Sequence, residues 1–157
     1  MRIYKIILMS LLTILILMML IGFFSIFQVS EEYYFILFFI LFAGIGIVVS
    51  LLSFLYHIKS FHYYRKSKSP KTTGKLATFL SVSSIICGIY YFLFAVLATL
   101  GKLSSSEELL VRDIILIIVI ALFGVLTILE VVITQKQIKK LLSTYKAKES
   151  IETIGDF

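Results

Sequence analysis

The sequence predicts an all-α integral membrane protein. The expected fold is a four-helix bundle of two antiparallel transmembrane hairpins, followed by a short amphipathic helix at the cytoplasmic C-terminal end. Hydrophobic side chains make up 60% of the 157 residues and charged ones only 15%, which is too apolar for a soluble domain of this size. The apolar residues form four long runs, and most basic residues fall in alternate segments between those runs.

Each apolar run is near or above the ~20 residues that an α-helix needs to cross ~30 Å of hydrocarbon. The predicted spans cover approximately residues 6–28, 33–57, 76–100 and 113–134. They leave little of the chain besides short connections and a tail. We therefore expect residues 1–157 to form a single transmembrane domain.

The first span begins like a secretory signal, because Arg2 and Lys5 precede a hydrophobic run. That run is too long for a signal, and no cleavage site with small residues closes it. We expect the first span to be retained as a membrane helix.

The distribution of charge predicts the orientation. Thirteen of the fifteen Lys and Arg residues precede the first span, lie in the loop 57–75, or follow the fourth span in the tail 135–157. Because cytoplasmic segments carry the excess of basic residues, both termini and the loop 57–75 are predicted to lie in the cytoplasm. Glu31 and Glu32 lie on the opposite side, where the connections are short.

Basic side chains at the inner surface are expected to contact anionic lipid headgroups. These residues are Lys59, Arg65, Lys66, Lys68, Lys71, Lys75, Lys136, Lys139 and Lys140. Aromatic residues lie among the basic ones in the loop, a mixture also found in nucleic-acid sites. Topology already accounts for the charge, so a nucleic-acid partner is not expected.

Two polar segments have the composition of helix N-termini. Ser30 precedes two glutamates at the start of the second span. Ser105 and Glu108 match a capping box and predict that the fourth helix begins there, before its apolar run. The tail continues as an amphipathic pattern with Ile138 and Leu142 on one side, and it loses its periodicity after Glu149.

Small residues follow one face of the second and third predicted spans. In lipid, close approach of backbones through such residues holds helices together. We therefore expect spans two and three to pack as a central pair, while span four has only Ala121 and Gly124 of this type. Alternatively, the stripe lines a pore or joins copies of the chain. Its residues are Ala77, Ser81, Ser84, Gly88, Tyr91, Ala95 and Ala98 in span three, and Ala43, Gly46, Ser50 and Ser53 in span two.

Glu130 is the candidate ionisable site within the membrane, because a charge inside a span is costly. No basic residue is available deeper in any span to pair with it. We expect Glu130 to lie near the cytoplasmic end, reaching headgroups or a lysine such as Lys59 or Lys136. The alternative is a proton or cation site.

No residue pattern predicts catalysis, a cofactor or a metal site. His57 and His62 are five residues apart and do not share a helix face. The single cysteine, Cys87, cannot form an intramolecular disulfide and is expected to serve as a small packing residue.

These features favour a non-enzymatic protein that acts by binding another membrane protein, as a transporter accessory, immunity or regulatory subunit. The alternative is a small oligomeric transporter or channel with Glu130 as its ionisable site. Self-association is compatible with either hypothesis. Abundant Ile, Leu, Phe and Lys with no Trp favours a bacterial plasma membrane as the location.

Overall fold

The computed structural model describes residues 2–29, 33–61, 74–104 and 110–154. It contains four helices: α1 (Arg2–Val29), α2 (Tyr33–Phe61), α3 (Lys75–Ser104) and α4 (Val111–Ile154). No strand occurs among the described residues. The predicted all-α fold with four long apolar helices packed together is confirmed.

All four helices are long and apolar enough to cross a membrane, as in a multi-pass membrane protein. A spanning segment must satisfy its backbone hydrogen bonds internally, and an unbroken helix does so. The single proline, Pro70, falls between α2 and α3 and interrupts none of them. Each of the four predicted spans lies within one helix.

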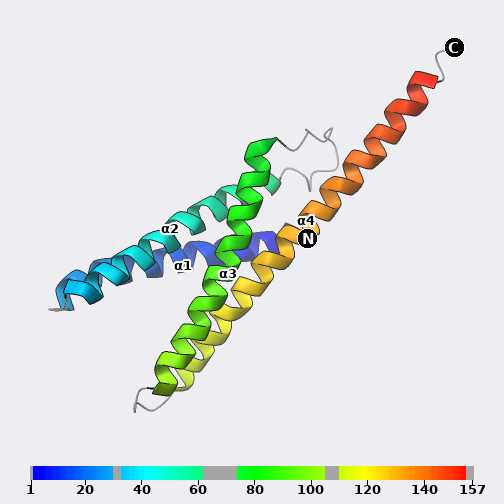
Figure 1. Cartoon of the computed structure of the whole chain (residues 1–157). Coiled ribbons are helices and arrows are strands. Elements are labelled where there is room, and N and C mark those ends of the chain that lie inside the picture. Colours follow the sequence, from blue (N-terminus) through cyan, green and yellow to red (C-terminus); the bar gives the residue numbers. More distant parts are fainter. Residues whose placement is uncertain (1, 30–32, 62–73, 105–109, 155–157) are drawn as a thin grey trace.

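The helices form two antiparallel hairpins, α1–α2 and α3–α4. Figure 1 shows the hairpins crossing near the N-terminus and diverging from there, so that their tips lie well apart. The second hairpin is the more tightly packed, because α3 and α4 share the most extensive of all helix contacts, ahead of α2–α3 and α1–α2. The pair α1–α4 makes far fewer contacts.

Spans two and three do pack against each other, as the small-residue stripe predicts, but the contact between α3 and α4 is more extensive than theirs. Close backbone approach occurs between α3 and α4, at Gly88 and Gly124. A Cβ atom added to Gly88 would lie 2.7 Å from the carbonyl oxygen of Gly124, and one added to Gly124 would lie 2.6 Å from that of Gly88. Each of these glycines faces the backbone of the other helix, so α3 and α4 approach each other closely at this point.

Apolar side chains cover the outside of the bundle. Ile14 on α1, Leu55 on α2, Leu97 on α3 and Leu122 on α4 are each more than half exposed. In water such a surface would cause aggregation, whereas in a bilayer it meets acyl chains of similar polarity.

The two ends of α4 differ from the expectation. The helix begins at Val111, where the amides of Asp113 and Ile114 donate to the carbonyl oxygen of Leu110. The capping box at Ser105 and the serine at position 30 lie outside the described residues. At the other end, the tail is no separate helix. It continues α4 as far as Ile154 and projects beyond the other helices (Figure 1).

Candidate functional site

A cluster of three ionisable side chains lies inside the bundle, where the two hairpins meet. Glu130 comes from α4, Lys5 from α1 and His57 from α2. Their side chains are 2%, 1% and 0% exposed, respectively. A carboxylate and an ammonium enclosed in this way are costly unless they compensate each other.

The two oxygens of the Glu130 carboxylate have different partners. Oε1 lies 2.9 Å from Lys5 Nζ and accepts a hydrogen bond of 2.8 Å from the hydroxyl of Thr134, one helical turn further along α4. Oε2 lies 3.3 Å from His57 Nδ1. Lys5 Nζ also donates to Ser60 Oγ. The carboxylate therefore contacts residues from α1 and α2, linking both hairpins.

The histidine side of the cluster is less well satisfied than the lysine side. Neither nitrogen of His57 has a hydrogen-bond partner of normal geometry, and neither does Glu130 Oε2. The 3.3 Å approach of His57 Nδ1 to Oε2 is thus an electrostatic contact without hydrogen-bond alignment. A buried polar atom left without a hydrogen bond costs about 1–3 kcal/mol of folding free energy. The enclosed position of His57 therefore lowers the stability of the fold.

Helix register explains why these residues meet. Lys5 stands on the buried face of α1, in step with Leu8, Leu12 and Leu15, which are also buried. His57 continues the buried stripe of α2 four residues after Ser53. Because side chains three and four apart share one helix face, each polar residue is carried into the interior by its apolar or small neighbours.

The expected partners of Glu130 were wrong. Lys59 and Lys136 are exposed, and the carboxylate pairs with Lys5 and His57 instead. In the sequence, Lys5 is one of the charges that precede the first predicted span, but α1 already begins at Arg2. The spacing of Lys5 with Leu8, Leu12 and Leu15 is the sequence signal that would have placed it on the buried face.

The stripe of small residues faces the interior. Ala43, Gly46, Ser50 and Ser53 of α2 are all buried. On α3, Ala77 and Ala98 are half-buried. The other five α3 positions are buried, namely Ser81, Ser84, Gly88, Tyr91 and Ala95.

Hydroxyl groups of the stripe bond to one another across the α2–α3 interface. Ser53 Oγ lies 2.8 Å from Ser84 Oγ, and Ser50 Oγ lies 2.9 Å from the Tyr91 hydroxyl. These contacts are those of a packing face. Cys87 is fully buried in the same layer, with its Sγ 3.9 Å from Ser50 Oγ.

The residues expected to contact lipid headgroups are described only in part. Those described are exposed, namely Lys59, Lys75, Lys136, Lys139 and Lys140. Arg65, Lys66, Lys68, Lys71 and His62 lie outside the described residues. Within the described ranges, no group of three or more His, Cys, Asp or Glu residues is placed to hold a metal ion.

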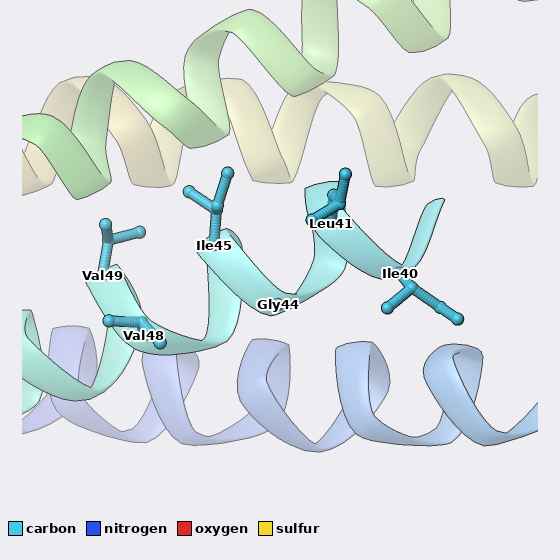
Figure 2. Close-up of a pocket in the computed structure, with 6 residues that line it drawn as sticks. All are labelled: Ile40, Leu41, Gly44, Ile45, Val48 and Val49. Atoms are coloured by element: carbon cyan, nitrogen blue, oxygen red, sulfur yellow. The ribbon is translucent and has the colours of Figure 1, made fainter. Parts of the chain in front are cut away.

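A second feature is an open apolar groove on α2, which ends eight residues before His57 on the same helix. It has a volume of about 330 Å³ and is lined by Ile40, Leu41, Gly44, Ile45, Val48 and Val49. In Figure 2, Leu41 and Ile45 project to one side of the helix while Gly44 leaves a notch between its larger neighbours. A Cβ atom added to Gly44 would meet nothing within 4 Å.

No known protein family, curated protein or solved structure matches this chain. Its fold and site define it as an α-helical protein with four candidate membrane spans and an enclosed cluster of ionisable side chains. The ionisable cluster and the α2 groove are the two features from which a function can be inferred.

Proposed function

We propose that this chain is a non-enzymatic membrane protein that acts by binding another membrane protein, as a transporter accessory, immunity or regulatory subunit. The observation that supports this proposal is the groove on α2, where Gly44 faces open space. A small residue on a membrane helix lets a second helix approach closely. Gly46, two residues later, already contacts Met19 and Tyr90 within the chain, but Gly44 has no such neighbour.

Crosslinking in native membranes tests this proposal. A photoreactive residue at Ile45, which lines the groove, is compared with one at Ile14, which is similarly exposed on α1. We expect the Ile45 probe, and not the Ile14 probe, to form an adduct with one other membrane protein. The same adduct must disappear in Gly44→Leu, which fills the notch.

Gly22→Leu is the matched control, because a Cβ atom there also meets nothing within 4 Å. It should leave the adduct unchanged. Adducts with lipid alone, or equal adducts from both probe positions, would contradict the proposal. Adducts between two copies of this chain would replace it with self-association.

The second candidate function is a small oligomeric transporter or channel. The burial of Glu130 beside Lys5 and His57 favours it, since ionisable residues enclosed in membrane helices often mark ion or proton pathways. Reconstituted protein should then move ions or solutes across liposomes, and Glu130→Gln should abolish the flux. Asp113→Asn is the control, because Asp113 is the other described carboxylate paired with a lysine, Lys102 at 3.3 Å.

We further propose that the protein lies in a bacterial plasma membrane with both termini, the loop 57–75 and the tail 135–157 in the cytoplasm. The charge distribution supports this orientation, and anionic headgroups are the proposed contacts of the exposed lysines. A membrane-impermeant label should fail to reach a cysteine at Lys66 in intact cells. Labelling from outside would reverse the proposed topology.

A further inference from the structure

The charge cluster is a polar bridge between α1 and α4, two helices whose backbones come close to each other at few points. The contacts of α1 with α4 are much fewer than those within either hairpin. Yet Lys5 and Tyr4 of α1 both reach α4, Lys5 through the Glu130 carboxylate and Tyr4 through a hydrogen bond of 2.8 Å to the carbonyl oxygen of Leu126. These polar contacts lie beside an apolar cluster that contains the buried leucines of α1 and Phe123 of α4.

Because of its position, the bridge can influence the angle between the two hairpins. It lies where the N-terminal end of α1 crosses α4, and the hairpins diverge from that crossing (Figure 1). A small rotation at the crossing moves the distant tips further apart. The pair Lys5–Glu130 is thus placed to set the spread of the two hairpins.

The cluster also contains a second group, His57, that can balance the charge of Glu130 when it is protonated. His57 Nδ1 already lies 3.3 Å from Glu130 Oε2, and both its nitrogens are buried without a hydrogen bond. Lys5 lies in the first turn of α1 and has a long side chain that can extend to the headgroup region. A protonated His57 could then balance the carboxylate while Lys5 is at the surface.

We propose that the Lys5–Glu130 pair is a lock between the two hairpins, and that His57 takes over the charge of Glu130 when Lys5 leaves. In the locked arrangement, lysine and carboxylate balance each other and His57 is neutral. In the unlocked arrangement, Lys5 lies at the membrane surface, and His57 has taken a proton from the aqueous phase. The enclosed charge sums to zero in both, so the exchange leaves no bare charge in the bilayer.

Acid favours the unlocked arrangement, because that arrangement holds one more proton. The groups that face His57 and the carboxylate are Lys5 from α1 and Thr134 on α4, with Tyr56 beside His57 on α2. From α3, the side chain packed against Tyr56 is Leu80, which carries no charge. The lock is independent of the proposed partner, since it concerns only the spread of the hairpins.

Distances between spin labels on the two hairpins test the lock in lipid nanodiscs. The labels replace Phe24 on α1 and Leu103 on α3, which are 68% and 66% exposed, in a Cys87→Ala background. We expect Lys5→Met to give a longer and broader distance distribution than the parent. Lys59→Met, the same change at an exposed lysine near His57, should leave the distribution unchanged.

A second label pair, at Leu100 and Ile115, reports on the α3–α4 hairpin alone. This distance should be the same in the parent and in Lys5→Met, which shows that the hairpin itself remains folded. An unchanged distance between Phe24 and Leu103 in Lys5→Met overturns the lock. Loss of the Leu100–Ile115 distance also overturns it, since Lys5 would then support the fold rather than hold the hairpins together.

Combined variants test the role of His57. Lys5→Met with His57→Gln leaves Glu130 with neither partner, so we expect loss of the folded α3–α4 distance that Lys5→Met alone retains. Lys5→Met with His62→Gln, which removes the chain's other histidine, should behave like Lys5→Met. In the chain with Lys5 present, acidification should lengthen the Phe24–Leu103 distance, and His57→Gln should remove that response. Equal behaviour of the His57 and His62 variants overturns the charge exchange.

Discussion

The junction around Glu130 and the contact between Gly88 and Gly124 join helices in opposite ways. At the junction, long side chains from α1 and α4 meet through charge, although the backbones of these helices approach closely at few points. At the glycine contact, side chains are absent and the backbones of α3 and α4 touch directly. The junction depends on a pair of opposite charges, whereas the glycine contact depends only on the close fit of two backbones.

This difference matters because lipid provides no hydrophobic drive between helices. A glycine contact gains dispersion energy in small increments and needs no partner of opposite charge. A charge pair is asymmetric: removing one member leaves an enclosed charge without compensation, while replacing both can be nearly neutral. The glycine contact therefore suits a permanent hairpin, and the charge pair suits an arrangement that changes.

The largest expected effect is that of breaking the charge pair. Lys5→Met combined with His57→Gln leaves the Glu130 carboxylate enclosed without either partner that can balance its charge, and should lower the free energy of unfolding by about 3–5 kcal/mol. Reversible unfolding in mixed detergent micelles measures this change. Lys59→Met should stay within about 0.5 kcal/mol of the parent, as exposed substitutions do, and equal losses in both variants would show that burial of Lys5 and His57 has no energetic weight.

A smaller effect is expected at the glycine contact. In Gly124→Ala the new Cβ atom would lie 2.6 Å from the Gly88 carbonyl oxygen and 2.9 Å from the Phe92 amide nitrogen. Both are backbone atoms, so α3 and α4 must separate, at about 1–3 kcal/mol. The same unfolding assay applied to Gly22→Ala, where no atom lies within 4 Å, should show no loss. Similar values for the two alanine variants would refute close backbone contact.

The hydroxyl pair between Ser53 and Ser84 should contribute less still. A double-mutant cycle with Ser53→Ala and Ser84→Ala isolates the hydrogen bond, whose atoms lie 2.8 Å apart. The expected coupling is about 0.6 kcal/mol, typical of hydrogen bonds between membrane helices. A coupling indistinguishable from zero would mean that these serines act only through their small size.

The smallest effect on stability is expected in the groove. Gly44→Ala should change the free energy of unfolding of the isolated protein by no more than about 0.5 kcal/mol, because its Cβ atom meets nothing within 4 Å. In native membranes, the larger Gly44→Leu change should still abolish partner crosslinking. A marked loss of stability in purified Gly44→Ala would place this glycine inside the fold rather than on a binding face.

Local pattern was enough to find the helices and the buried face of α3, because length, hydropathy and small-residue spacing are properties of single segments. The same spacing did not identify the helix that α3 packs against most closely. Gly88 meets Gly124 of α4, although α4 carries few small residues. Which faces meet depends on how the hairpins cross, and that crossing is a property of all the contacts together.

The sequence predicts one member of the candidate site, Glu130, but not the residues that it contacts. Glu130 stands out in any reading of the fourth span, since a carboxylate in an apolar run is conspicuous. Its partners do not stand out. Lys5 lies 125 positions away, in a basic segment whose charge is already explained by the orientation of the first span. The spacing of His57 and His62 argues against a metal site, but it does not predict that His57 is enclosed completely, as it is in the structure.

By itself, the sequence determined that this chain forms four long apolar helices, since the bilayer thickness and the need for internal hydrogen bonds constrain each segment separately. Tertiary structure alone decided that α3 and α4 form the tightest pair and that Lys5, His57 and Glu130 share one enclosed site. Distances between helices depend on interlocking surfaces, whereas helix formation depends only on near neighbours in the chain.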